Sequence, residues 1–373
     1  MVTGYDAISE IDLFDLGGMS CTRGGVIRNY TSPFITGKTS FDRATIFAIG
    51  AAAEALGLSN QPTSSDKKYS AADIGIITAT NFASIASGEA ALADIAHADA
   101  KACLNCAQQT VLHEIADTLQ LGGLRVALSL SCASGAAALA YGASLIRRGQ
   151  AKRMLIVAFD AISRFAWSGL CCLRTMTKGL VQPFDLNRSG TIFSEGAAAL
   201  LLEGAKTRDA CQQTPLAEIT GWATNNNGFH LTAPAPRGRG SFLVMRDAIK
   251  LSGVAPDQID HINAHGTATK PNDLTESQAF HDLFGERAAT IPVTSIKSSI
   301  GHMLGAAGAI EAIASIKTLQ TGIIPPTIHF ETPDPECPVK LVANQPQEGE
   351  FKYVLSNSAG IGGCNSAIVF AKP

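Results

Sequence analysis

A stretch of 21 residues between Arg125 and Arg147 carries no charged side chain, and this feature constrains the fold of the chain more than any other. Its sequence, VALSLSCASGAAALAYGASLI, consists largely of Ala, Ser and Gly, so it is too weakly apolar to span a lipid bilayer. We therefore interpret it as a segment buried deep inside the protein. It predicts a strand over residues 125–130, followed by a helix over 133–148 that ends before Gly149.

The rest of the chain alternates short β-branched runs with longer Ala-rich helical patterns. This alternation favours an α/β fold with central, mostly buried sheets. The patterns predict a helix at 305–320 and further strands at 154–159, 259–263, 291–295, 352–358 and 366–371.

The length of 373 residues is that of two domains or of one duplicated unit. The polar segment 204–214 (GAKTRDACQQT) is the best candidate for a boundary. It divides the chain into an N-terminal half, residues 1–205, and a C-terminal half, residues 206–373, each with strand–helix–strand order. We find no repeat at the level of letters that would prove a duplication.

Composition excludes several classes of function. The net charge is −3 and no basic stripe is present, which argues against a partner made of nucleic acid. The nine cysteines lack disulfide-like spacing, and the pair Cys103 and Cys106 lacks a second pair that would complete a metal site. Together with an acidic beginning that includes Asp6 and Glu10, this predicts a cytoplasmic protein with no membrane span and no metal.

Cys132 lies in SLSCASGAA, between the predicted strand and the predicted helix. A thiol at the N-terminus of a helix is exposed to a partial positive charge, which lowers its pKa and favours a nucleophilic thiolate. Ser134 and Gly135 keep the first turn small, leaving space for a substrate carbonyl. From this segment alone, a packed core cysteine is an equally good interpretation.

Two histidines follow predicted strands and lie beside glycines. His265 lies in NAHGTATKPND, and His302 lies in SIKSSIGHMLGAAGAIE. The carboxyl ends of strands are the places where α/β sheets expose reactive groups. Lys297 lies in such apolar surroundings that it needs a counter-charge, for which Glu311 on the following helix is the natural candidate.

Six segments in this order resemble those of one known family. They are SCASGAAALAYGASLIRRGQAKRMLIVAFDA, QPFDLNRSGTIFSEGAAALLLE, HLTAPAP, NAHGTATKPNDLTE, SIKSSIGHMLGAAGAIEA and SNSAGIGGCN, within about residues 125–370. Together they resemble the elongating β-ketoacyl-acyl carrier protein synthases, condensing enzymes of the thiolase fold. The resemblance implies a duplicated, five-layer αβαβα architecture, with the nucleophile in the N-terminal half and the His, Lys and His residues in the C-terminal half.

The resemblance also implies a role for each catalytic candidate. Cys132 matches the nucleophile that takes the acyl chain from the carrier protein as a thioester. His265 and His302 match the pair that supports decarboxylation of malonyl thioester and stabilises the enolate oxygen, for which neutral Nε2–H donors would serve. Lys297 matches the active-site lysine of the family, and Glu311 matches its ion-pair partner.

Other residues match binding elements of the family. The backbone N–H groups of Cys132 and Ile361 match the oxyanion hole. Thr267 and Thr269 match hydroxyls of the pantetheine tunnel, and Thr232 in HLTAPAP is assigned to substrate binding in the same way. Arg174 falls where relatives carry a basic residue that faces the acidic carrier protein.

The resemblance implies no cofactor of the enzyme's own, because phosphopantetheine arrives on the carrier protein. A second basic cluster that could face this partner consists of Arg147, Arg148, Lys152 and Arg153, although such clusters are usually solvated helix ends. The strand 154–159 resembles the edge through which the family forms dimers. The dimer partner can be an identical chain or a homologous ketosynthase or chain-length subunit.

Ala359-Gly360-Ile361 departs from the family pattern, which has two phenylalanines around the glycine. The second of these phenylalanines acts as a gate in relatives, so the smaller Ile361 alters the expected gating and chain preference. We interpret this change as a sign of a specialised polyketide or polyene-type ketosynthase rather than a housekeeping fatty-acid enzyme.

Three alternatives remain. Cys364 in GIGGCN invites comparison with a degradative thiolase, and a Cys-His-Asn set would indicate an initiating synthase; the block containing Lys297 and His302 speaks against both. The third alternative is a non-catalytic chain-length partner in a heterodimer. Such subunits usually lack the nucleophile, which is present here.

Overall fold

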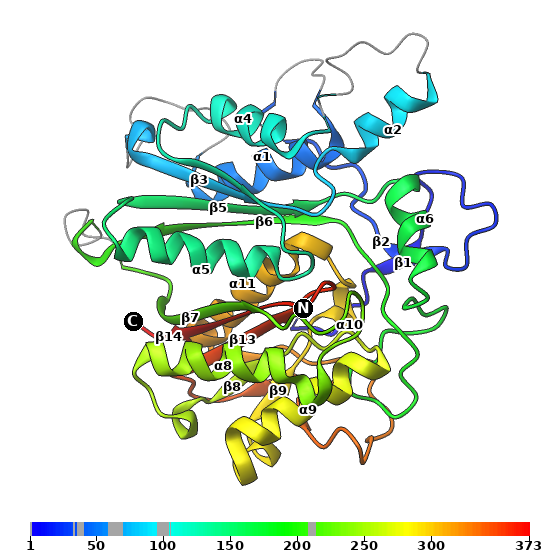
Figure 1. The fold of residues 1–373 in the computed structure, drawn as a ribbon, viewed down its shortest axis with the longest axis vertical. Coiled ribbons are helices and arrows are strands. Elements are labelled where there is room, and N and C mark those ends of the chain that lie inside the picture. The colour runs from blue at the N-terminus through cyan, green and yellow to red at the C-terminus, as the bar shows by residue number, and fades with distance from the viewer. Residues whose placement is uncertain are drawn as a thin grey trace.

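The computed structural model describes residues 2–32, 34–35, 41–58, 70–94, 104, 106–207 and 214–373. Figure 1 shows five layers: helices, a sheet, a central pair of helices, a second sheet and a further layer of helices. This arrangement confirms the predicted αβαβα architecture. One outer layer contains α1 (Arg43–Ala55), α2 (Ile85–Ala93) and α4 (Gln108–Thr118). The central layer consists of α5 (Ser134–Arg147) and α11 (Ala307–Thr321). The other outer layer contains α8 (Arg239–Ser252) and α9 (Lys270–Phe284).

The first sheet has four strands in the order β4-β3-β5-β6, with only β6 antiparallel to its neighbour. The second has six strands in the order β11-β9-β8-β13-β14-β7. Their bounds are β3 (Ile74–Ala79), β4 (Arg125–Leu128), β5 (Arg153–Asp160), β6 (Gly196–Glu203), β7 (Glu218–Asn226), β8 (His261–Asn263), β9 (Pro292–Thr294), β11 (Lys340–Leu341), β13 (Tyr353–Ala359) and β14 (Cys364–Ala371). Two short pairs lie outside these sheets: β1 (Ile8–Glu10) with β2 (Arg23–Gly25), and β10 (Ile323–Ile324) with β12 (Gln347–Glu348).

Both sheets contain the same four-strand unit. In the first sheet β3 is parallel to β4 and β5, and β5 is antiparallel to β6. In the second sheet β8 is parallel to β9 and β13, and β13 is antiparallel to β14. The duplication that no repeat of letters reveals is therefore visible in the topology.

The central helices explain the uncharged segment. A side chain on Gly135 of α5 would lie 2.7 Å from the backbone nitrogen of Ala309 in α11, and one on Gly308 would lie 2.6 Å from that of Ala136. Because the two helices approach this closely between two sheets, only small residues fit, and no water is available to solvate a charge. Among the described residues, no helix has both the length and the apolarity needed to cross a membrane.

Each predicted strand and helix has its counterpart in the structure, with shifts of a few residues at the ends. The segment 204–214 follows β6 and precedes β7, but residues 208–213, like Cys103, lie outside the described part. The division at residue 205 stays a prediction. One expectation is wrong: the strand predicted at 154–159 is β5, which pairs with both β3 and β6 and so cannot be a dimer edge. The parallel edge of this sheet is β4.

Candidate active site

Four loops at the carboxyl ends of parallel strands carry the candidate catalytic residues. Cys132 follows β4, His265 follows β8, Lys297 and His302 follow β9, and Ile361 follows β13. Of these strands, β4 and β9 occupy matching places in the two duplicated units, whereas β8 and β13 match β3 and β5. Nζ of Lys297 lies 3.4 Å from Nδ1 of His265, and the His265 ring contacts that of His302. The Lys297 charge also acts on the Cys132 thiol, so the four side chains share one site.

A tight turn presents Cys132 at the start of α5. Ser131 has a φ of 53°, in the left-handed region that few non-glycine residues adopt. The Ser134 hydroxyl accepts a hydrogen bond from Leu130 N–H at 2.7 Å and lies 2.6 Å from the Ser131 carbonyl oxygen, which fixes the turn. The side chain that results is buried, with 6% of Cys132 exposed.

The thiol does not have the lowered pKa that its place before a helix predicts. Burial raises the pKa of Cys132, and this effect outweighs the opposing effects of the Ser131 hydroxyl, the Lys297 ammonium and the Ile361 backbone N–H. The resting form is therefore a neutral thiol. A thiol of this kind loses its proton during attack on the substrate rather than before it.

His265 and His302 lie against each other, with ring centroids 5.4 Å apart and the rings nearly perpendicular. Both are buried, and burial lowers the pKa of each imidazole well below the usual histidine range. The Lys297 charge acts in the same direction. Both rings are therefore neutral at physiological pH and can donate a hydrogen bond without carrying a charge.

Hydrogen bonds fix which nitrogen of each ring carries the proton. The Leu304 backbone N–H donates to Nδ1 of His302 at 3.1 Å, so the proton of this neutral ring lies on Nε2. Nδ1 of His265 lies 3.4 Å from Nζ of Lys297, which has only protons to donate when charged. The site thus contains two neutral Nε2–H donors, as the sequence resemblance leads us to expect.

Lys297 is anchored from two sides. Its ammonium group donates to the His265 carbonyl oxygen at 2.6 Å and forms a buried ion pair with Glu311 of α11. The Ser358 hydroxyl lies 3.4 Å from the other oxygen of Glu311. Burial raises the pKa of Glu311 to about 7, although Lys297 and Ser358 both oppose the rise. The expected pairing of Lys297 with Glu311 is thus present in the structure.

Sequence analysis overlooked Glu276 on α9, which supports the backbone of the His265 loop. Its two carboxylate oxygens accept the N–H groups of His265 at 2.7 Å and of Gly266 at 2.8 Å, and Asn357 donates to one of them at 2.7 Å. A buried acidic residue eleven positions after a loop histidine, in the quoted segment NAHGTATKPNDLTE, was the available signal.

The turn after β13 places a backbone amide at the thiol. The Ile361 N–H lies close enough to the sulfur of Cys132 to lower the pKa of the thiol, against the larger effect of burial. Gly360 permits this approach, because a side chain there would lie 3.1 Å from the backbone nitrogen of Cys132. The two amides assigned to an oxyanion hole are therefore neighbours, and half-buried Ile361 stands at the mouth of the site.

The three threonines assigned to substrate binding occupy different surroundings. Thr267 is buried, and its hydroxyl lies 2.9 Å from that of Thr269 on the loop that follows His265. Thr232 is exposed on a separate loop. The preceding residue of that loop, Leu231, accepts the N–H of Gly362 at 2.8 Å, so this loop adjoins the turn that carries Ile361.

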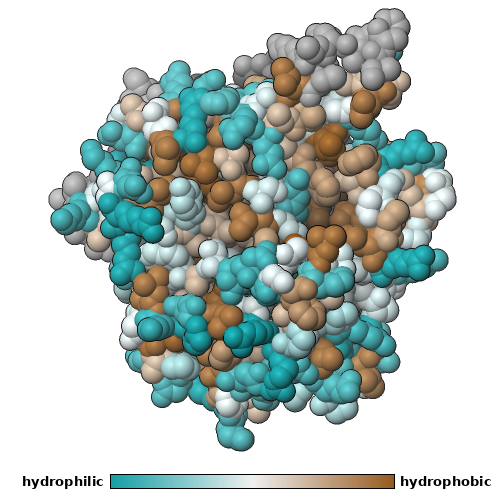
Figure 2. Space-filling view, in the orientation of Figure 1, coloured by the Kyte–Doolittle hydropathy of each residue, from teal (hydrophilic) through white to brown (hydrophobic). Residues whose placement is uncertain are grey.

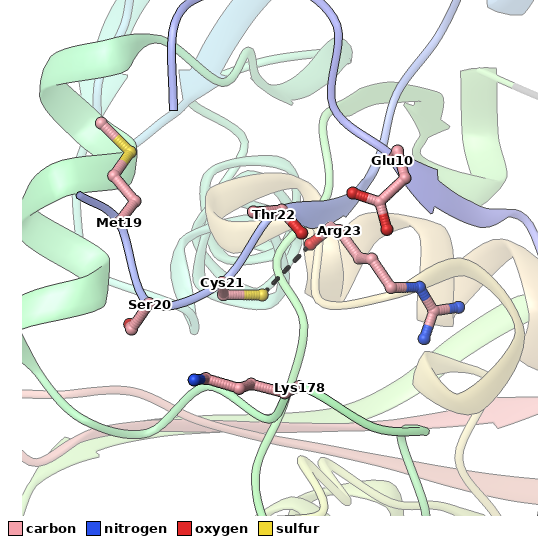
Figure 3. Close-up of a pocket in the computed structure, with 7 residues that line it drawn as sticks. All are labelled: Glu10, Met19, Ser20, Cys21, Thr22, Arg23 and Lys178. Atoms are coloured by element: carbon pink, nitrogen blue, oxygen red, sulfur yellow. Dashed lines mark hydrogen bonds between the residues drawn. The ribbon is translucent and has the colours of Figure 1, made fainter. Parts of the chain in front are cut away.

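Arg174 is exposed on the loop after α6 (Arg164–Cys172), and exposed Lys178 lies on the same loop. A surface pocket beside Lys178 is lined by Glu10 and residues 19–23 (Figure 3). There the Cys21 thiol lies 3.4 Å from the Thr177 carbonyl oxygen, and Arg23 donates to Gly179 at 3.0 Å. These contacts fix the position of the loop that carries Arg174 and Lys178.

The second predicted basic cluster is incomplete. Arg153 is buried and paired with Glu203 at 2.7 Å, so it is not available to a partner. Arg147 and Arg148 are exposed at the end of α5 opposite to Cys132. A helix of 14 residues is about 21 Å long, which places these two arginines far from the thiol.

Comparison with protein families gives two matches. The profile described as Beta-ketoacyl synthase, N-terminal domain, matches residues 2–208. The profile described as Beta-ketoacyl synthase, C-terminal domain, matches residues 216–331.

Among curated proteins, 3-oxoacyl-[acyl-carrier-protein] synthase 2 of Staphylococcus aureus (strain COL) is 37% identical over 248 residues, covering 65% of this chain and 60% of that protein. The chain thus spans 60% of the length of this relative. The enzyme of the same name from Synechocystis is 30% identical, covering 100% of this chain and 92% of that protein.

Among solved structures, the ishigamide ketosynthase/chain length factor is 28% identical with a TM-score of 0.89, covering 100% of this chain and 93% of that one. A type II polyketide synthase acyl-carrier protein in complex with its ketosynthase, bound to the hexaketide, is 26% identical with a TM-score of 0.88 and the same coverage. These likenesses confirm the predicted thiolase-like fold.

Proposed function

Because the chain belongs to the β-ketoacyl synthase family, we propose that it catalyses a decarboxylative Claisen condensation. An acyl group held on Cys132 is joined to malonyl-acyl carrier protein, giving 3-oxoacyl-acyl carrier protein and carbon dioxide. The observation that carries this proposal is the pair of neutral Nε2–H imidazoles, His265 and His302, in one buried site with the thiol.

The first step transfers the acyl group. The sulfur of Cys132 attacks the thioester carbonyl, and the backbone N–H groups of Cys132 and Ile361 stabilise the oxyanion of the tetrahedral adduct. The carbon–sulfur bond to pantetheine then breaks, and the thiol proton leaves with the departing pantetheine sulfur. A soft sulfur nucleophile suits this exchange of one thioester for another.

The second step generates the carbanion without a strong base. The Nε2–H groups of His265 and His302 donate to the thioester oxygen of the malonyl group, on which charge accumulates as carbon dioxide leaves. Because the rings are already neutral donors, they stabilise this enolate without a proton transfer. Its α-carbon then attacks the acyl carbonyl, and the bond to Cys132 breaks to leave a thiolate, which takes up a proton from solvent.

Lys297 and Glu311 maintain the electrostatics of this site. The buried ammonium favours the neutral form of both imidazoles, and its ion pair with Glu311 compensates its own charge. This scheme uses neither a metal nor an organic cofactor of the enzyme. Phosphopantetheine arrives with the carrier protein, and we assign Thr267, Thr269 and Thr232 to the lining of its path.

We place the carrier protein on the loop that holds Arg174 and Lys178. Both cations are exposed, and the loop is held by the contacts of Cys21 and Arg23 described above. Acidic carrier protein is the complementary partner, and one structural neighbour is a ketosynthase solved with its acyl-carrier protein. Arg147 and Arg148 lie at the end of α5 opposite to Cys132, so we do not assign this role to them.

A dimer with an identical or homologous chain is the proposed assembly, formed along β4 rather than β5. Strand β4 is a partly exposed edge of its sheet, and its half-buried last residue Leu128 lines a surface hollow together with half-buried Leu130 and Trp222. Figure 2 shows apolar side chains gathered at the level of the first sheet. A structural neighbour pairs a ketosynthase with a chain length factor, which makes a homologous partner chemically reasonable.

The proposal also includes a cellular location and a class of substrate. The seven described cysteines are free thiols, which supports a cytoplasmic location. Ile361 and Ala359 in place of two aromatic residues support a specialised polyketide or polyene substrate rather than a saturated fatty acyl chain.

Acyl transfer to Cys132 tests the proposed function. Incubation of the protein with a panel of acyl-carrier proteins should add the mass of an acyl group to the peptide that contains Cys132. Cys132→Ala should abolish this label and condensation, whereas malonyl decarboxylation persists because both imidazoles remain.

Absence of label in the wild-type protein, alone and with a homologous partner, would favour the chain-length subunit instead. Loss of decarboxylation as well, in a folded Cys132→Ala variant, would contradict the division of roles between thiol and imidazoles.

A further inference from the structure

Asp160 is a buried carboxylate that the mechanism above does not use. It lies at the carboxyl end of β5 and is completely buried. Its side chain accepts the Thr80 hydroxyl at 2.7 Å and three backbone N–H groups, from Asn81 at 3.0 Å, Phe82 at 2.9 Å and Gly305 at 2.7 Å. These donors come from both halves of the chain.

No cation compensates this charge, since no ion pair involving Asp160 occurs within the described residues. Burial raises the pKa of Asp160 to about 6, although its hydrogen bonds oppose the rise. A buried carboxylate without a counter-ion is destabilising unless its donors are held in place. Of the four donors to Asp160, the one from the C-terminal half is the N–H of Gly305, three residues after His302.

The turn between His302 and Gly305 is strained and tightly packed. Leu304 has a φ of 52° and is buried, an unfavourable conformation for a bulky residue. A side chain on Gly305 would lie 2.8 Å from Oδ2 of Asp160. The bond from Gly305 N–H to Asp160 therefore needs glycine, and it holds the chain in this conformation.

The same turn determines the protonation of His302. Leu304 N–H, directly before Gly305, is the donor that occupies Nδ1 of His302. If the turn relaxed, this N–H would swing away from the ring, and neither nitrogen would be preferred for the proton. The route from Asp160 to the imidazole consists of one hydrogen bond, one peptide unit and a second hydrogen bond.

We propose that Asp160 is a positioning residue for His302. By accepting the Gly305 N–H it holds the Leu304 turn, and the turn keeps the proton of His302 on Nε2, where the malonyl oxygen is bound. The inference rests on the proposed function for the meaning of this tautomer, but the tautomer itself can be measured without turnover.

The experiment compares Asp160→Asn with Asp260→Asn. Asparagine keeps the size of the side chain but replaces one acceptor oxygen by an NH2 group. Asp260 also accepts two backbone N–H groups, from Lys352 at 2.7 Å and Tyr353 at 3.0 Å. It lies before β8, at the end opposite to His265, and so controls for the loss of a carboxylate acceptor elsewhere.

Three readouts follow the variants. Asp160→Asn should slow decarboxylation of malonyl-acyl carrier protein by about tenfold or more, as expected for a lost hydrogen bond to a charged group. Alkylation of Cys132 by iodoacetamide should not fall, because the Asp160 charge raises the pKa of the thiol and its removal favours the thiolate. Nitrogen NMR of ring-labelled histidine should show Nε2–H His302 in the wild type and a mixture of tautomers in the variant. Asp260→Asn should leave all three unchanged.

An equal fall of decarboxylation and alkylation would contradict the inference, because it would indicate a general structural role. An unchanged tautomer in Asp160→Asn would also contradict it. If the wild-type protein decarboxylates no malonyl thioester, the proposed function fails and the tautomer alone decides the inference. If Asp160→Asn does not fold, Gly305→Ala replaces it, since the added methyl group breaks the same hydrogen bond from the other side.

Discussion

Cys132 illustrates how two physical effects compete at a single residue. The end of α5 favours a thiolate, but burial between two sheets favours the neutral thiol, and burial is the larger effect. For exchange between two thioesters this is no disadvantage, because the attacking and departing sulfurs can trade a proton. A neutral thiol is also protected from unwanted alkylation and oxidation.

Alkylation of Cys132 by iodoacetamide should therefore depend steeply on pH. Because burial raises the pKa of this thiol above 9, the thiolate fraction grows with pH throughout the neutral range. The rate constant should rise about tenfold per pH unit between pH 7 and 9. Peptide mass spectrometry isolates this cysteine from the others. A rate that is already constant above pH 7 would show that the helix end dominates.

The site residues identified from the sequence differ from the overlooked ones in the sequence separation of the contacts that define them. Cys132, His265 and His302 follow strands directly, so local pattern and family resemblance both identify them. The contact from Asp160 to Gly305 spans 145 residues, and that from Glu276 to Asn357 spans 81. No local pattern shows such contacts, so the supporting carboxylates appear only in the structure.

In strand β8, a buried histidine outside the site lowers the stability of the fold at acid pH. His261, its first residue, is buried against Phe351, and neither ring nitrogen has a hydrogen-bond partner among the described residues. Burial lowers the pKa of His261 from 6.5 to about 3. The unfolded chain therefore binds a proton below pH 6.5 that the folded protein does not, and the stability of the fold decreases as the pH falls through this window.

His261→Leu should remove this dependence. Between pH 7.5 and 5 the free energy of unfolding of the wild type should fall by about 2 kcal/mol more than that of the variant. Urea unfolding at the two pH values measures the difference. His113→Leu, at an exposed position of α4, is the matched control and should behave like the wild type. Equal pH dependence in His261→Leu and the wild type would contradict the account.

The strand patterns predicted the elements well because each has a local period, but they did not predict the order of strands in a sheet. Residues 154–159 of strand β5 are fully buried and apolar, which is equally compatible with an edge covered by a partner and with a central position. Only its pairing with β3 and β6 distinguishes the two. The duplicated topology likewise depends on pairing between distant segments.

At the scale of the whole molecule, the proposed docking loop after α6 presents the exposed cations Arg174 and Lys178. Arg174→Glu and Lys178→Glu should each raise the KM for acyl carrier protein about twofold to fivefold, since exposed ion pairs contribute about 0.5–1 kcal/mol. The dependence of KM on salt should decrease, and kcat should remain unchanged. Steady-state kinetics at several salt concentrations provides the measurement.

Arg148→Glu, at the far end of α5, is the control for a change of net charge. An equal rise of KM in this variant would indicate a nonspecific effect of charge. An unchanged KM in the two loop variants would remove the loop after α6 from the docking surface.

Elongation of an acyl chain tests the central claim most directly. The protein, alone and with a homologous partner, is given acyl-carrier protein loaded with a panel of primers, together with malonyl-acyl carrier protein, and the products are analysed by mass spectrometry. The account predicts 3-oxoacyl-acyl carrier protein, longer by two carbons, and its loss in Cys132→Ala and in His302→Ala. Failure of every primer to be extended by folded wild-type protein, or undiminished extension by Cys132→Ala, would contradict it.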